Sequence, residues 1–227
     1  MLRNPFFLFA VLILIGFTSC DDDDDTFTGP IVGSGNMVSE DRNLANFNEV
    51  NVSDDIDVNL TAGVSFGVKV STDDNLVRNV ITEVNGNVLN IRRQVGPNYG
   101  EVDMTVDVTL PLLRTIRANN AADVSFSGFQ DTANDLLIDA NNASEVEGSN
   151  TTTRGLNITL NNASEADLYG VTAPTASVNL SNKSELEVAV TDRISGTVVN
   201  NSTLTYRNDP NVADVKTSGG GTVKKAN

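Results

Sequence analysis

The chain lacks tryptophan and histidine, and aromatic residues make up only 5 % of its 227 residues. The absence of histidine excludes general acid–base catalysis by an imidazole. Because Cys20 is the only cysteine, a disulfide within the chain is impossible and a zinc site of nitrogen and sulfur ligands cannot be assembled. We therefore expect no cofactor, and stability has to come from aliphatic packing and backbone hydrogen bonds.

Positive charge is also scarce in this sequence. The chain carries 30 acidic and 15 basic residues, which gives a formal net charge of −15. An acidic surface repels phosphate backbones and anionic lipid headgroups. The composition therefore argues against a nucleic acid as a partner and against electrostatic docking on anionic lipid.

The first residues have the layout of an export signal. A single arginine precedes an apolar run over residues 6–17, which is too short to span a bilayer but fits the hydrophobic region of a signal peptide. The sequence Thr-Ser-Cys at 18–20 resembles the lipobox of bacterial lipoproteins, although Phe17 stands where leucine is usual. We expect a signal peptide over residues 1–19 and attachment to a membrane through lipid on Cys20. The alternative is a plain secretory signal followed by a chance cysteine.

Five consecutive aspartates occupy residues 21–25. Their mutual repulsion excludes a helix or strand there, so they form either a solvated spacer or an address. As an address, the run resembles the acidic export signal of Bacteroidetes lipoproteins, which implies display on the outer face of the outer membrane. Residues 26–36 carry Gly, Pro and Ser, so we interpret residues 20–36 as a tether.

Residues 37–225 read as one all-β domain, because apolar and polar residues alternate with a period of two. The longest regular alternation runs from Val102 to Leu110. Only residues 74–82 could form a short helical turn, with Leu76 and Val80 on one side.

The second half of the chain repeats at intervals of about 20 residues, which is typical of the coils of a β-solenoid. Apolar residues recur at the same places in each repeat and are expected to point inward. An asparagine between the two strand-like arms is expected to form a corner, where it tolerates left-handed backbone and can build an amide ladder. This corner column consists of Asn120, Asn142, Asn162, Asn182 and Asn200. A long antiparallel sandwich is the alternative fold, but it would not require this self-similarity.

The order of these motifs resembles the head GIN domain of putative auto-transporter adhesins, a family common among Bacteroidetes lipoproteins. The matching features are a Gly-Ser-Gly lead at 33–35, a Phe-x-x-Val strand at 47–50, an Asp-Asn-Leu turn at 74–76 and the later corner repeats. The resemblance covers roughly residues 36–210 and implies a right-handed β-solenoid that acts as an adhesin. Many repeats of the family have a Ser-Gly-Ser-Gly corner, whereas this chain mostly has Asn-Asn-Ala-Ser.

A second column of the repeat is acidic and consists of Asp123, Glu145, Glu165 and Glu185. Strands stacked at about 4.8 Å would bring these carboxylates into one axial row. The row is either a solvated feature screened by counterions, a Ca²⁺ site, or the acidic cluster of a pectate-lyase-like enzyme. Catalysis has little support, since Lys183 is the only basic residue of the corner columns and aromatic platforms for sugars are few.

We therefore expect a non-enzymatic, surface-anchored lipoprotein that binds or scaffolds. Long stacked strands offer an ordered face to an envelope protein or a surface glycan. Two alternatives stay open at this point: a polysaccharide-active enzyme built on the same solenoid, and a purely structural envelope protein.

Overall fold

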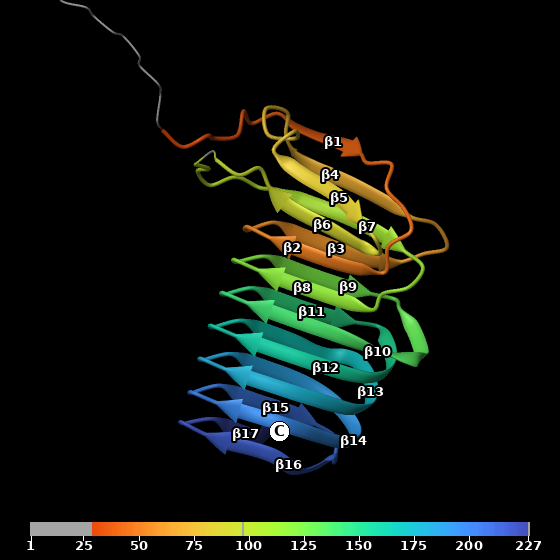
Figure 1. Cartoon of the computed structure of the whole chain (residues 1–227), viewed down its shortest axis with the longest axis vertical. Helices are drawn as coiled ribbons and strands as arrows, with labels where there is room; N and C mark the ends of the chain where they lie inside the picture. Colours follow the sequence, from red (N-terminus) through yellow and green to blue (C-terminus); the bar gives the residue numbers. More distant parts are fainter. Residues whose placement is uncertain (1–28, 97, 227) are drawn as a thin grey trace, which may run out of the picture.

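The computed structural model describes residues 29–96 and 98–226, and this part of the chain contains strands, turns and loops but no helix. Its strands stack in parallel into a β-solenoid of about six coils (Figure 1), so the predicted fold class is confirmed. The expected signal peptide, Cys20 and the aspartates at 21–25 lie outside the described residues.

The strands follow one another along the chain with short connections, and most pair with strands one coil above and one coil below. They are β1 (Met37–Asp41), β2 (Glu49–Ser53), β3 (Asp57–Ala62), β4 (Gly67–Asp73), β5 (Val80–Asn85), β6 (Val88–Arg93), β7 (Thr105–Leu110), β8 (Thr115–Asn119), β9 (Asp123–Ser127), β10 (Gln130–Asn141), β11 (Glu145–Ser149), β12 (Thr151–Asn161), β13 (Glu165–Ser181), β14 (Glu185–Val199), β15 (Thr203–Arg207), β16 (Asn211–Ser218) and β17 (Thr222–Lys225).

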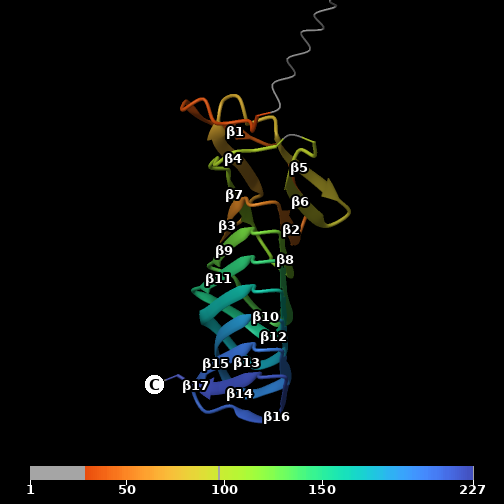
Figure 2. The same ribbon diagram turned by 90° about the vertical axis from the view of Figure 1, so that its left-hand side faces the viewer.

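Two sheets run along the solenoid axis, as the turned view in Figure 2 shows from the narrow side. The first sheet has the order β5-β6-β2-β8-β10-β12-β13-β14-β16. The second sheet has the order β1-β4-β7-β3-β9-β11-β13-β14-β15-β17. The long strands β13 and β14 bend from the second sheet into the first, so each belongs to both.

The core lies between the two sheets and is filled by one inward residue every second position. Ile116, Ile138, Ile158 and Val178 lie directly above one another, and at most 1 % of each is exposed. Burial of one such side chain contributes about 1.5–3 kcal/mol, so stacked aliphatic residues can stabilise a core that contains few aromatic rings.

The ring of Phe126 shows how tightly this narrow core is packed. Only 2 % of Phe126 is exposed, and the residue directly below it in the next coil is Gly148. A Cβ at Gly148 would lie 2.4 Å from Cζ of Phe126. The absence of a side chain in one coil therefore makes room for a ring in the neighbouring coil.

The prediction of a short helical turn near 74–82 is wrong, because the structure has no helix there. Residues 74–79 form a turn, in which the Asp73 carbonyl oxygen accepts from Leu76 N at 2.9 Å and from Val77 N at 3.1 Å. Strand β5 then begins at Val80. The β-branched residues Val80, Ile81 and Thr82 favour a strand, and burial of Leu76 and Val80 produces the apolar spacing that imitates a helix.

The N-terminal coils form a cap that departs from the repeat. Strand β4 runs antiparallel to β1 and β7, and β5 runs antiparallel to β6. The loop that leads into β1 is fixed to the turn after β4, because Gly35 N donates to Asp73 Oδ1 at 2.7 Å and Ser34 Oγ donates to Asp74 Oδ1 at 2.6 Å. The chain therefore enters the solenoid at the capped end.

Candidate functional site

The asparagine column forms the corner between the first and second sheets. All five asparagines have left-handed backbone, with φ between 55° and 59°, and the residue after each also has positive φ. The next residue is Ser144, Ser164, Ser184 or Ser202 in four of the corners, and each of these serines is at most 1 % exposed. Ser164 Oγ donates to Asn161 O at 2.8 Å, which satisfies a carbonyl group inside the bend. The Asn-Asn-Ala-Ser pattern is therefore a two-residue left-handed bend closed by a buried hydroxyl group.

The corner side chains also form a continuous amide ladder along the axis. Asn142 Nδ2 donates to Asn120 Oδ1 at 3.1 Å, and the next step, from Asn162 to Asn142, measures 3.0 Å. The ladder continues from Asn182 and then from Asn200, at 3.0 and 3.1 Å. At the N-terminal end of the ladder, Asn120 Nδ2 donates to Asp54 Oδ1. Asp54 and Asp55 also have left-handed backbone. Residues 53–55, with the sequence Ser-Asp-Asp, thus form the first corner, which the repeat in the sequence did not identify.

Replacement of Asn162 tests what the ladder contributes. Asn162→Ala removes two side-chain hydrogen bonds and places a less tolerant residue at φ 56°, so we expect a loss of roughly 2 kcal/mol in the free energy of unfolding. Asn162→Gly removes the same bonds without the backbone penalty, so its loss should be about 1 kcal/mol smaller. Urea denaturation of both variants measures the difference. Stability equal to the wild type in Asn162→Gly would show that the ladder contributes nothing.

The acidic column lies on the outer surface of the second sheet, directly beside the corner. Asp123, Glu145, Glu165 and Glu185 are direct neighbours on β9, β11, β13 and β14. The structure adds Asp57 of β3 above them and a second row, formed by Glu147, Asp167 and Glu187, two residues further along the strands. We call these eight carboxylates the acidic face. The acidic face arises from the strict register between coils rather than from a sequence motif. The alternation of outward residues in the sequence is the signal that could have revealed its second row.

Crowding changes the proton affinity of the acidic face. Partial burial, with the neighbouring charges of Asp123 and Glu165, raises the pKa of Glu145. Partial burial with nearby carboxylates likewise raises the pKa of Asp57 and of Asp123. Two shallow clefts of about 290 and 200 Å³ lie over the rows, and neither is lined by an arginine or a lysine. The arrangement therefore concentrates negative charge in clefts that no cationic side chain lines.

The raised pKa of Glu145 predicts a pH-dependent contribution to stability. Between the usual value of 4.5 and the raised value, the folded state binds more protons than the unfolded state. The contribution of Glu145 is therefore fully present below pH 4.5 and is lost as the pH rises through the raised pKa. At pH 7 we expect Glu145→Gln to increase the melting temperature by about 1–2 °C, a small effect because the group is mostly exposed.

Asp135 provides a control, because its pKa is shifted in the opposite direction to that of Glu145. The Arg154 guanidinium, whose Nε donates to Asp135 Oδ1 at 2.8 Å, holds the pKa of that carboxyl below its usual range. Asp135→Asn should therefore lower the melting temperature slightly at neutral pH. Thermal unfolding of both variants at pH 4 and pH 7 checks the pair. A decrease for Glu145→Gln at pH 7 would contradict the expected repulsion.

The geometry of the acidic row lends the calcium hypothesis little support in the part of the chain that the structure describes. No group of three or more acidic, cysteine or histidine residues is placed there to hold a metal. Stacked carboxylates on a flat sheet point in one direction, whereas Ca²⁺ takes six to eight oxygens from around it. We therefore expect the melting temperature to stay unchanged in millimolar Ca²⁺. An increase that disappears in Glu165→Gln would favour the calcium hypothesis instead.

The outer surface of the first sheet has a different chemistry. Eight outward positions on β12, β13 and β14, in three successive coils, present amide or hydroxyl groups, and Arg193 and Val199 of β14 border this set. The eight residues, which we call the uncharged face, are Asn157, Thr159, Asn161, Ser177, Asn179, Ser181, Ser195 and Thr197. Thr197 Oγ1 donates to Asn179 Oδ1 at 3.1 Å, and Asn161 Nδ2 donates to Asn141 Oδ1 at 3.0 Å. Sequence reasoning did not single out this face.

Comparisons with known proteins agree with this architecture. The family model described as "Putative auto-transporter adhesin, head GIN domain" matches residues 46–210. A crystal structure of a putative adhesin from Bacteroides fragilis has a TM-score of 0.66 at 16 % identity, covering 86 % of this chain and 100 % of its own. No curated protein matches the chain.

Two further solved structures, both from Parabacteroides distasonis, share the fold. One is called a putative lipid binding protein, with a TM-score of 0.59 at 16 % identity, and covers 88 % of this chain and 100 % of its own. The other is a putative adhesin, with a TM-score of 0.55 at 21 % identity, and covers 87 % of this chain and 100 % of its own. Within the described residues, no helix is long and apolar enough to cross a membrane.

Proposed function

The chain belongs to the family of the putative auto-transporter adhesin head GIN domain, and we propose that it is a lipid-anchored adhesin or binding module of the cell envelope. Membership of an adhesin-type family supports a place at the cell surface or in the envelope. The proposed anchor is lipid on Cys20, the aspartates at 21–25 act as the export address, and residues 20–36 form the tether. Residues 37–225 then form the domain held away from the lipid.

The uncharged face is the surface that we propose for binding. Its amides and hydroxyls can both donate and accept hydrogen bonds, which suits the hydroxyl groups of a neutral glycan. Strands in register repeat these groups about every 4.8 Å along the axis, so a chain of sugar units can meet the same chemistry in successive coils. The single observation that carries this proposal is that eight neighbouring outward positions on three successive strands of a strongly acidic protein carry no charge.

The acidic face supports a non-enzymatic role. Its two clefts are lined by carboxylates without a cationic partner, whereas the lyase chemistry considered from the sequence requires a basic residue near the acids. The family and the similar structures are named as adhesins or as a lipid binding protein rather than as enzymes. We propose that this face keeps anionic surfaces away and leaves recognition to the opposite sheet.

Adhesion of cells that display the protein tests the binding face. We expect Ser177→Glu, which places a carboxylate in the middle of the uncharged face, to reduce adhesion to immobilised neutral mannan several-fold. Thr172→Glu is the matched control, because Thr172 is exposed on the same strand β13 but lies outside the uncharged face. Equal adhesion of the two variants would refute the assignment of this face.

A further inference from the structure

Strand β5 has a free edge at the capped end of the solenoid. It pairs only with β6, and the bond from Gln94 N to Asn79 O, at 2.7 Å, extends the same antiparallel ladder. The alternation of that ladder turns the backbone N–H and C=O groups of Val80, Thr82 and Val84 away from β6. Among the described residues, no backbone group hydrogen-bonds to them on that side. The edge is therefore a row of unpaired donors and acceptors.

The other free edges of the sheets carry charges that oppose strand pairing. Strand β1 ends in Glu40 and Asp41. At the far end of the solenoid, β16 carries Asp214 and Lys216, and β17 carries Lys224 and Lys225. Charged residues on an edge are a common protection against pairing with another chain. Strand β5, with the sequence VITEVN, has one charge, no proline and no bulge against β6. It is the edge best suited to accept a strand.

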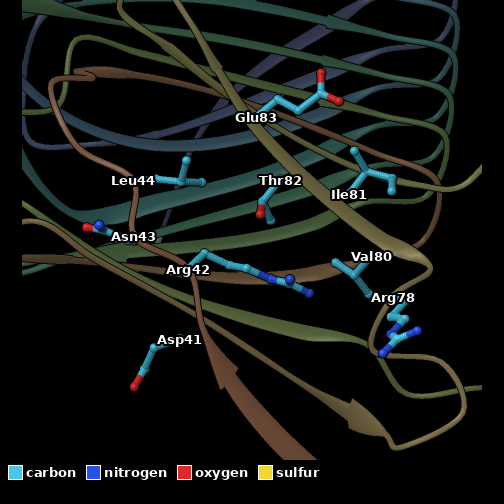
Figure 3. Close-up of a pocket in the computed structure, with 9 residues that line it drawn as sticks. All are labelled: Asp41, Arg42, Asn43, Leu44, Arg78, Val80, Ile81, Thr82 and Glu83. Carbon is cyan, nitrogen blue, oxygen red and sulfur yellow. The ribbon is translucent and has the colours of Figure 1, made fainter.

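A cleft of about 400 Å³ runs along this edge, between β5 and the segment 41–44 (Figure 3). Four consecutive residues, 80–83, line one side, which means that the cleft follows the edge of the strand rather than one of its faces. Leu44 and Ile81 supply apolar surface, whereas only 2 % of Val80 is exposed. In Figure 3 the side chain of Arg42 extends from one wall towards Val80 on the other. The volume lies in the range of small ligand sites and suits one or two side chains of a peptide.

Arg78 places an unused positive charge in the lining of the cleft. Arg42 is already bound to Glu40 Oε1 at 2.6 Å and to the Val77 carbonyl oxygen at 2.9 Å. Arg78 is exposed and, among the described arginines, is the one without an ion pair, hydrogen bond or aromatic contact to another described residue. An exposed guanidinium is a good partner for a carboxylate. Because Asp41 and Glu83 also line the cleft, the attraction for an acidic group is local to Arg78.

We propose that the β5 edge is a docking site for an extended, acidic peptide segment of a partner protein. The segment adds to the first sheet as a further strand through the backbone groups of Thr82 and Val84. It places an apolar side chain against Leu44 and a carboxylate beside Arg78. Backbone hydrogen bonds supply affinity in such strand addition, while side-chain pockets supply specificity. This site is separate from the uncharged face and does not depend on the function proposed for that face.

Peptide titration of the mature chain, purified in detergent, tests the proposal. The probe is a capped six-residue peptide that alternates valine and threonine and carries one glutamate, labelled for fluorescence anisotropy. We expect saturable binding that is lost when alternate peptide nitrogens are methylated, because methylation removes the donors needed for strand pairing. Replacement of the glutamate by lysine should weaken binding roughly fivefold, as expected for an exposed ion pair.

Two variants locate the site. Thr82→Pro removes a donor from the free edge without removing a β5–β6 bond, so it should abolish binding while the melting temperature shows that the fold persists. Arg78→Glu, at a residue with no partner to lose, should weaken binding of the acidic peptide and improve binding of the lysine peptide. Lys216→Glu is the matched control, since it makes the same charge change on β16 and should leave binding unchanged.

Three results would overturn the proposal. These are no binding of the peptide at millimolar concentration, equal binding by wild type and Thr82→Pro, and equal binding by wild type and Arg78→Glu. Light scattering of the same samples identifies the other occupant, because a dimer of this chain that Thr82→Pro dissociates would assign the edge to a second copy instead.

Discussion

Gly196→Ala is expected to reduce the free energy of unfolding by roughly 3 kcal/mol or more, which corresponds to about 10 °C in melting temperature for a chain of this size. Gly196 lies in β14 with φ 129°, a conformation that residues with a side chain rarely adopt. A Cβ there would lie 1.9 Å from the carbonyl oxygen of Val178 in the preceding coil. Since that obstacle is backbone in a hydrogen-bonded strand, it cannot rotate away as a side chain would. The coils would have to separate locally.

Gly86 provides the control for this prediction. It also has positive φ, at 65°, but a Cβ there would meet no atom within 4 Å. Asparagine tolerates this backbone, so Gly86→Asn should cost less than about 1 kcal/mol. Denaturant titration of both variants gives the comparison. Similar losses for the two would mean that positive φ, rather than contact between coils, sets the cost at Gly196.

Cys20→Ser is expected to release nearly all of the protein from the membrane fraction. A thiol is the attachment point in lipoprotein maturation, and a hydroxyl group cannot replace it. The described residues contain no helix that could hold the chain in a bilayer. Fractionation of cells grown with a labelled fatty acid measures both label incorporation and membrane association. Full retention of an unlabelled Cys20→Ser protein in the membrane fraction would contradict the proposed anchor.

The acidic run should control which face of the membrane displays the domain. Replacement of all five aspartates at 21–25 by asparagine is expected to leave lipid labelling intact and to remove accessibility to protease added to whole cells. The unaltered protein, in contrast, should be cleaved under these conditions. Protection of the unaltered domain from protease would contradict surface display, while the anchor at Cys20 would still stand.

The two proposed binding surfaces differ in their distance from this anchor. The described chain enters at the cap, next to β1, and the coils with the uncharged face extend away from that end (Figure 1). If Cys20 holds the tether, the β5 edge lies near the membrane and the uncharged face lies further out. A partner in the same envelope suits the first position, and a glycan on another surface suits the second.

The sequence by itself determined the repeating part of this fold. Asn142 and Asn162 recur at fixed spacing because only a few residues accept the left-handed bend that closes each coil, and Ile138 and Ile158 recur because each coil must fill the same interior. Such requirements act locally on every repeat, so they leave a periodic trace in one chain. The same periodicity predicts one row of carboxylates, formed by Asp123, Glu145, Glu165 and Glu185.

Only the tertiary structure decided what happens where the repeat breaks down. The apolar spacing of Leu76 and Val80 fits a helix as well as a turn followed by a strand, and the choice depends on the cap that buries both. Asp54 is a corner residue because Asn120, far along the chain, donates to it. The free edge of β5 and the unpaired Arg78 exist because neighbouring strands pair elsewhere, and pairing between distant segments is not encoded in the pattern of any one of them.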